Sequence, residues 1–116
     1  MGKELPRMNF LQKDGADILD GKKNIEVKVD DNLAASFCKP GVRFEFVIDE
    51  ITYQGETLRA ERLGDADGFV RSYFQDADRI FPGLTGGEEA FRWELNNRLG
   101  AGKIRKNGLL VITFEA

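Results

Sequence analysis

The sequence contains no histidine among its 116 residues, and this absence limits its chemistry more than any other feature. Histidine is the usual general base near neutral pH, the usual partner of a nucleophilic serine or cysteine, and the commonest transition-metal ligand. Catalysis would have to rest on carboxylate, lysine, arginine or tyrosine side chains, and no constellation of these is recognisable. We therefore predict a protein that is not an enzyme, with no catalytic, metal or cofactor-binding residues.

Cysteine is almost absent as well. Cys38 is the only cysteine, which excludes a disulfide within the chain and leaves too few ligands for a zinc site. No apolar run approaches the roughly 20 residues that a membrane-spanning helix needs. The first ten residues, MGKELPRMNF, lack the apolar segment of a secretory signal. We expect a cytoplasmic protein without a membrane partner.

The composition is otherwise that of a small globular protein. Hydrophobic residues make up 41% and charged residues 32% of the chain, and nine phenylalanines accompany two tyrosines and one tryptophan. Such a chain can bury a core filled largely by aromatic rings. Residues 1–24, which contain the turn dipeptides Asp14-Gly15 and Asp20-Gly21, are expected to be a partly ordered N-terminal segment. Residues 25–116 are expected to form a single β-rich domain.

Alternating apolar residues predict most of the strands. The stretch Val42–Tyr53 reads VRFEFVIDEITY and has the period of two that is typical of a strand with one face on a core. A loop at residues 54–56 and a return over residues 57–63 would make a hairpin, and residues 69–74 (FVRSYF) would add a third strand. Residues 25–29 (IEVKV) form a further short strand, followed by a short helix over residues 32–38.

One longer helix is predicted after residue 85. Thr85 followed by Glu88 has the spacing of a capping box, and Phe91, Leu95 and Leu99 share one stripe of the helix. Residues 103–106 and 109–114 would then form a final hairpin that turns at Asn107-Gly108.

The resulting order, three meandering strands, a helix and two more strands, is that of an OB-like five-stranded barrel. We predict an α+β fold, mainly antiparallel β, with the helix between strands three and four and an N-terminal strand and short helix as an extension. The alternative is an open antiparallel sheet with helices on one face. Both arrangements use the strand that begins at Val42 as the scaffold.

Charge is distributed unevenly along the chain. The net charge of the whole chain is −3, yet residues 91–116 contain five basic and two acidic side chains, which gives +3 and leaves −6 for residues 1–90. A basic face on an acidic body would fit this distribution and would attract a polyanion.

Three surfaces are candidates for ligand binding. The predicted third strand places Phe69, Arg71 and Tyr73 on one side with Arg59 on the neighbouring strand, an arrangement that could stack bases beside positive charge. Trp93 lies opposite the apolar stripe of its helix, so either the N-terminal segment covers it or it contacts a partner. The third surface is the basic segment with Lys103, Arg105 and Lys106. Each surface also has a purely structural explanation. One face of the third strand would fill the core, the helix side with Trp93 would be covered by the N-terminal segment, and the basic segment would be a solvated hairpin.

These patterns favour a non-enzymatic binding module for a macromolecule. Single-stranded nucleic acid is the sharper hypothesis, and a protein–protein interaction module, small inhibitor or adaptor is the alternative. Exposed Phe69 and Tyr73 beside arginines would favour nucleic acid. A buried pair with an exposed Trp93 would favour a protein partner.

Overall fold

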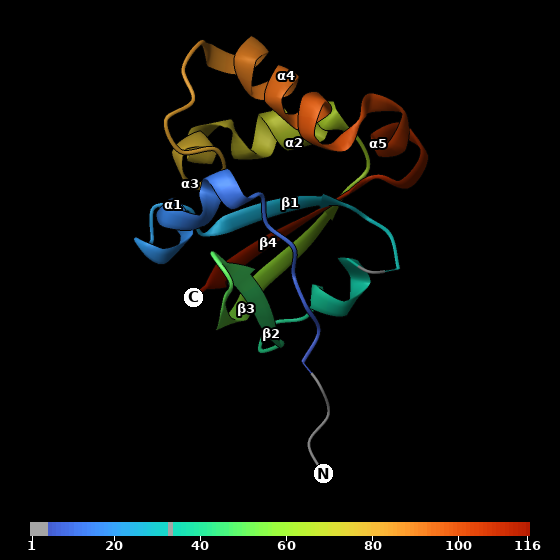
Figure 1. The fold of residues 1–116 in the computed structure, drawn as a ribbon. Helices are drawn as coiled ribbons and strands as arrows, with labels where there is room; N and C mark the ends of the chain where they lie inside the picture. The colour runs from blue at the N-terminus through green and yellow to red at the C-terminus, as the bar shows by residue number, and fades with distance from the viewer. Residues whose placement is uncertain (1–4, 33) are drawn as a thin grey trace.

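The computed structural model describes residues 5–32 and 34–116, and these residues form one four-stranded antiparallel sheet with helices on both faces (Figure 1). The strands are β1 (Ile25–Val29), β2 (Arg43–Ile48), β3 (Ile51–Leu63) and β4 (Leu109–Glu115). The helices are α1 (Gly15–Leu19), α2 (Ala66–Tyr73), α3 (Ala77–Ile80), α4 (Gly87–Leu99) and α5 (Ala101–Asn107), and the short 3₁₀ helices are η1 (Gln12–Asp14), η2 (Ala34–Phe37) and η3 (Phe74–Asp76).

The sheet has the strand order β1-β4-β3-β2, so the last strand of the chain is an inner one. β4 pairs with β1 on one side, where Val27 lies opposite Val111, and with β3 on the other. β3 is 13 residues long and pairs with both β2 and β4. Its register shifts between Thr57 and Arg59, and such a bulge bends a strand and increases its twist. The sheet is therefore curled.

Each face of the sheet carries its own hydrophobic core. Helices α2 to α5 cover one face, and its core is built from Ile25, Val27, Phe69, Val70, Tyr73, Ile80, Phe81, Phe91, Leu95, Ile104, Leu109 and Val111. The other face is covered by the N-terminal segment, α1 and η2, with a core of Met8, Ile18, Ala34, Phe37, Phe44, Phe46, Ile48, Leu110, Ile112 and Phe114. Because β4 contributes to both, its apolar residues form a continuous run instead of an alternation.

The predicted third strand, residues 69–74, is wrong: most of this segment belongs to helix α2. Asp65 caps the helix, and its carboxylate accepts a hydrogen bond of 2.7 Å from the amide three residues on. Phe69 and Tyr73 are four residues apart and face the same core, where Phe69 stacks on Phe91 of α4 with ring centroids 5.1 Å apart. Over six residues, alternating and helical spacing overlap, so periodicity alone does not separate them.

The predicted long strand Val42–Tyr53 is in fact a hairpin. β2 and β3 are joined at Asp49 and Glu50, whose φ angles are 50° and 68°. Positive φ at both turn residues usually calls for asparagine or glycine, which explains why this turn was not predicted. Gly55, the expected loop residue, lies inside β3 opposite Phe44, where a Cβ would stand 2.7 Å from the ring of Phe44.

The helix predicted after residue 85 is confirmed as α4, although Thr85 does not cap it, since Gly86 precedes the first turn without a side-chain hydrogen bond. Phe91 and Leu95 are fully buried, as the stripe predicted. Residues 103–106, predicted as a strand, belong to helix α5, which directs Ile104 into the core. The predicted final strand is confirmed as β4.

The α+β class with a mainly antiparallel sheet is confirmed, whereas the five-stranded OB-like barrel is not. The described residues supply four strands, and no pairing among them joins β1 to β2. The alternative open sheet is closer, but helices and turns cover both of its faces.

Candidate functional site: a basic pocket

The predicted nucleic-acid face on residues 69–74 does not form. Phe69 is 0% and Tyr73 8% exposed, because both belong to the core beneath α2 and α4. Tyr73 donates a hydrogen bond of 2.6 Å to Glu61, and burial together with this bond raises the pKa of Tyr73 to about 12. Arg71 is exposed on α2 and Arg59 is exposed on β3. No exposed aromatic pair therefore accompanies these arginines.

Trp93 lies on the outer side of α4 and is 64% exposed. The expectation that the N-terminal segment covers it is wrong, since Met8 and Phe10 pack in the core on the other face of the sheet. A buried aromatic pair with an exposed tryptophan is the arrangement that we associated with a protein partner.

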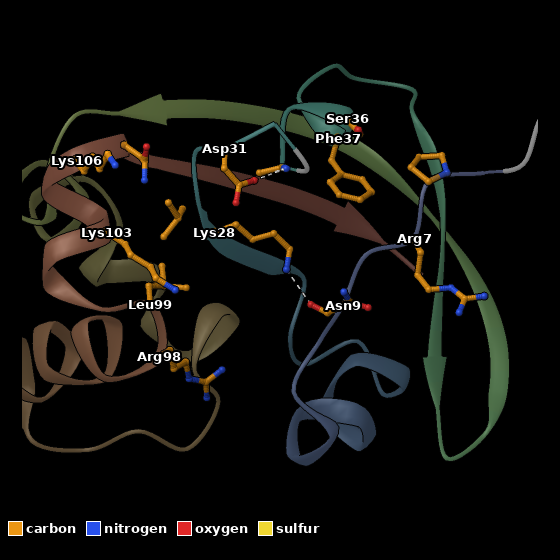
Figure 2. Close-up of a pocket in the computed structure, with 14 residues that line it drawn as sticks. Arg7, Asn9, Lys28, Asp31, Ser36, Phe37, Arg98, Leu99, Lys103 and Lys106 are labelled. Carbon is orange, nitrogen blue, oxygen red and sulfur yellow. Dashed lines mark hydrogen bonds between the residues drawn. The ribbon is translucent and has the colours of Figure 1, made fainter.

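A pocket of about 790 Å³ lies between α5 and the N-terminal segment (Figure 2). It is lined by Pro6, Arg7, Asn9, Lys28, Val29, Asp31, Ala34, Ser36, Phe37, Arg98, Leu99, Lys103, Lys106 and Asn107. Five of these side chains are basic and one, Asp31, is acidic, in a protein whose net charge is −3. We call this cavity the basic pocket.

The wall of the basic pocket formed by α5 contains two of the predicted candidates. Lys103 and Lys106 are three residues apart and so lie on the same side of the helix. Arg105 lies between them in sequence, is exposed, and does not line the pocket. The structure thus brings two candidates of this segment together and separates the third from them.

The opposite wall is the N-terminal segment, which is fixed at several points. The amide of Met8 donates to the carbonyl of Glu45 at 2.9 Å, and the amide of Glu45 donates to the carbonyl of Pro6 at 2.9 Å, so this segment pairs with the edge of β2. Lys28 on β1 donates to the carbonyl of Asn9 at 2.8 Å. Hydrogen bonds to two different strands therefore position this wall.

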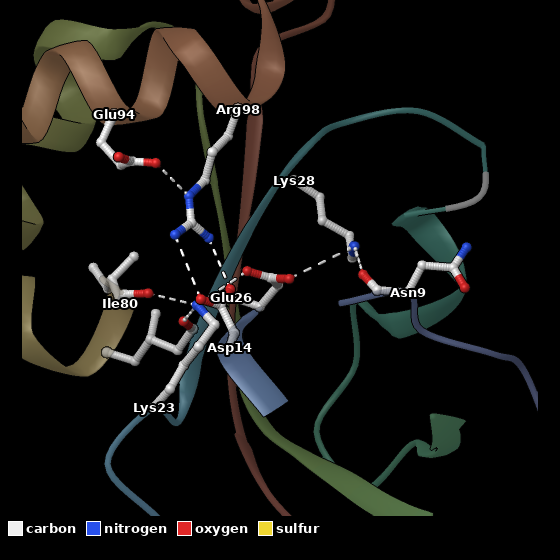
Figure 3. Close-up of polar contacts among 9 residues, drawn as sticks. Asn9, Asp14, Lys23, Glu26, Lys28, Ile80, Glu94 and Arg98 are labelled. Atoms are coloured by element: carbon white, nitrogen blue, oxygen red, sulfur yellow. Dashed lines mark hydrogen bonds and ion pairs between the residues drawn. The ribbon is translucent and has the colours of Figure 1, made fainter. Parts of the chain in front are cut away.

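A buried ion pair joins the two walls at one side of the pocket (Figure 3). Arg98 of α4 donates hydrogen bonds to Asp14 at 2.8 Å and to Glu94 at 2.7 Å. Burial by itself would lower the pKa of Arg98, but its hydrogen bonds to the two carboxylates raise that pKa above its ordinary value. The guanidinium also lies over the ring of Phe81, 4.6 Å from its centroid.

Lys23 is a second buried cation in the region of the Arg98 ion pair (Figure 3). Lys23 is 0% exposed, and its ammonium donates to the carbonyls of Ile25 and Ile80 and pairs with Glu26 at 3.2 Å. Glu26 also lies 3.9 Å from Lys28, on the floor of the pocket. All donors of Lys23 are therefore directed at protein oxygens, and its role is to anchor β1 and α3.

Sequence reasoning missed the residues that complete the pocket. Arg7, Asn9, Lys28 and Arg98 come from segments up to 91 positions apart, counted from residue 7 to residue 98. The only signal in the sequence was the excess of positive charge after residue 91. Topology, not local pattern, brings the four side chains to the lysines of α5.

The described residues, 5–32 and 34–116, contain neither a cluster of metal ligands nor a helix suited to crossing a membrane. No three histidine, cysteine, aspartate or glutamate side chains converge there in a way that could hold a metal ion. No helix in that part has both the length and the hydropathy to cross a membrane.

No protein-family model matches the chain, and no curated protein matches it in sequence. Solved structures do match the fold. The crystal structure of hypothetical protein PH0355 superposes with a TM-score of 0.75 at 18% identity, over 94% of this chain and 95% of that chain. The solution NMR structure of protein PF0455 from Pyrococcus furiosus gives a TM-score of 0.70 at 17% identity, over 97% and 96% of the two chains. At these identities the likeness establishes the fold alone.

Proposed function

We propose that the protein is a non-enzymatic binding module whose basic pocket binds single-stranded nucleic acid through its phosphates. The supporting observation is the concentration of five basic side chains around one cavity of an acidic protein. Lysine and arginine that neutralise phosphates release condensed counterions, and this release drives much of nucleic-acid binding.

The lysines of α5 are expected to contribute most of the affinity. Within the described residues, Lys103 and Lys106 take part in no ion pair and are exposed, whereas Arg98 and Lys28 already contact carboxylates. A phosphate can therefore approach the α5 lysines without displacing an acidic side chain. Binding to Arg98 or Lys28 would compete with existing partners.

The pocket favours a single strand over a duplex. Lys103 and Lys106 lie on the α5 wall and Lys28 lies on the floor, whereas the Arg7 side chain extends away from α5 (Figure 2). A thin chain inside the pocket therefore meets positive charge on the α5 wall and on the floor. A duplex could only rest across the rim. Phe37, the one aromatic residue of the lining, is 4% exposed, so base stacking adds little and the binding should tolerate changes of base sequence.

The test compares charge reversals on the same helix. In fluorescence anisotropy with a labelled single-stranded oligonucleotide at low salt, Lys103→Glu/Lys106→Glu is expected to weaken binding at least tenfold. The slope of log affinity against log salt concentration should become shallower by about 1.4, since each phosphate contact on a single strand contributes about 0.7.

Arg105→Glu is the matched control, because it reverses a charge on α5 outside the pocket. It should reduce affinity by less than about threefold, as expected for long-range electrostatics alone. The single variants Lys103→Glu and Lys106→Glu change the net charge by the same amount as Arg105→Glu. Equal losses for all three single variants would show that net charge, and not the pocket, determines binding. Absence of binding by the wild-type protein at low salt would reject the proposal.

A protein-interaction module is the second candidate function, and the buried Phe69 and Tyr73 with the exposed Trp93 favour it. We rank it second because a single exposed side chain supports it, whereas five basic side chains around one cavity support the first proposal. Exposed tryptophans are frequent anchors of protein interfaces. Trp93 does not line the basic pocket, so Trp93→Ala should leave oligonucleotide affinity unchanged. If the wild-type protein does not bind oligonucleotides, the Trp93 surface becomes the leading candidate.

A further inference from the structure

The basic pocket is bounded on four sides. The end of α4 and helix α5 form one side and the N-terminal segment forms the opposite side. Arg98, which is paired with Asp14, lines the third side, and Asp31, Ser36 and Phe37 line the fourth. Asp31 is held there because its carboxylate accepts a hydrogen bond of 2.8 Å from the amide of Ala34.

A strand that passed through the cavity would have to cross one of these sides or bend back out through the open side. The Arg98–Asp14 pair is an unfavourable place to cross, because its two side chains are only 13% and 7% exposed and separating them would leave both charges without a partner. A chain end needs no exit. It can enter from the solvent side and stop at the floor beside Lys28.

We propose that the pocket captures the phosphorylated end of a single strand, and this inference rests on the proposed nucleic-acid function. The volume of about 790 Å³ lies within the range of roughly 300–1,000 Å³ that is typical of pockets for compact ligands. A terminal nucleotide with its phosphate is a compact ligand, whereas the internal part of a strand is not.

The charge of the lining fits a terminal phosphate. A phosphomonoester carries a charge of about −1.5 to −2 at pH 7 and offers three strong acceptor oxygens, whereas each internal phosphodiester carries a single negative charge. The lining residues sum to +4, from five basic side chains and Asp31. Three of the basic side chains already have carboxylate partners outside the lining, Arg98 with Asp14, Lys28 with Glu26 and Arg7 with Glu45. The two lysines of α5 therefore supply the positive charge that is available for a phosphate. Lys103 and Lys106 face the cavity from one helix side, so both ammonium groups can donate to the same phosphate.

The experiment uses four single-stranded oligonucleotides of identical sequence: linear with a 5′-phosphate, linear with a 3′-phosphate, linear with hydroxyl groups at both ends, and a covalently closed circle. At least one phosphorylated form is expected to bind ten times more tightly than the hydroxyl form and the circle. The Lys103→Glu/Lys106→Glu variant should lose this preference, and Arg105→Glu should keep it.

The outcomes separate this inference from the function on which it rests. Equal binding of the circle and the phosphorylated strands would overturn end capture and leave nucleic-acid binding intact. Failure of all four to bind would reject both. Competition with a mononucleoside monophosphate identifies the source of the phosphate: if it displaces the strand at equal concentration, the pocket recognises a small phosphate ester and strand-end capture is wrong.

Discussion

The position of Tyr73 shows how one side chain can change its role between sequence and structure. Its spacing from Phe69 fits a base-stacking surface on a strand, but it fits the buried side of a helix equally well. In the structure the ring stacks on Phe69 with centroids 5.5 Å apart, and the hydroxyl finds its partner in Glu61. A buried tyrosine commonly satisfies its hydroxyl in this way.

The raised pKa of Tyr73 predicts a loss of stability at alkaline pH. The pKa is about 12 in the folded protein and about 10 in an unfolded chain, so between these values only the unfolded chain releases the phenolic proton. The contribution of Tyr73 is therefore complete below pH 10 and is lost as the pH rises through 12. Urea denaturation at a series of alkaline pH values should show a steeper decline for the wild-type protein than for Tyr73→Phe.

Tyr53→Phe serves as the control for this series, since it removes the other tyrosine and retains the contact between Tyr73 and Glu61. It should keep the wild-type decline. If stability declined as steeply at alkaline pH in Tyr73→Phe as in the wild-type protein, the decline would not be due to Tyr73.

At the scale of elements, the hairpin between β2 and β3 contains strain that can be relieved. Glu50 has a φ of 68°, a left-handed conformation that costs a residue with a Cβ about 1 kcal/mol. Glu50→Gly should therefore increase the free energy of unfolding by about 0.5–1 kcal/mol, measured by urea denaturation. Glu56→Gly makes the same replacement inside β3 and should be destabilising by a similar amount. Equal effects of the two variants would show that the turn is not strained.

How much of each element could be predicted depends on its length and on its neighbours. Strand β1, strand β4 and helix α4 were found because their patterns are clear over the whole element. Helices α2 and α5 contain 8 and 7 residues, too few for their spacing to exclude a strand. The turn at Asp49 was missed because both of its residues have positive φ without being glycine or asparagine.

Only part of the basic pocket was predictable, because its basic residues come from segments that are far apart in the sequence. Lys103 and Lys106 lie in a stretch whose positive charge is visible in the sequence. Arg7 and Lys28 join them only because the N-terminal segment pairs with β2 and β1 lies beside β4. Contacts between such distant segments leave no local pattern.

At the scale of the whole molecule, Arg98 connects the N-terminal segment to the layer of helices. Arg98→Met is expected to lower the free energy of unfolding by about 3 kcal/mol, since it leaves the buried Asp14 and the partly buried Glu94 without their partner. Limited proteolysis should also cut the chain near Asp14 more readily than in the wild-type protein.

Arg62→Met is the matched control for this prediction. Arg62 pairs with Asp30 at 2.9 Å, but its side chain is 59% exposed. The loss should stay below about 1 kcal/mol, as for other surface ion pairs. Similar losses of unfolding free energy for the two variants would show that the Arg98–Asp14 pair contributes no more to stability than a surface ion pair.

The inner position of β4 has a consequence for the order of events during synthesis. β4 is the last element in the chain, and it supplies the partner for β1, with Ile25 opposite Thr113, and for the second half of β3. Until the ribosome has released residues 109–115, the nascent chain has the β2–β3 hairpin but no strand to complete the sheet. Both cores lack their shared strand during this time, so most apolar residues stay uncovered. A nascent chain that has not reached residue 115 therefore exposes apolar residues of both cores, and exposed apolar surface of this kind favours aggregation.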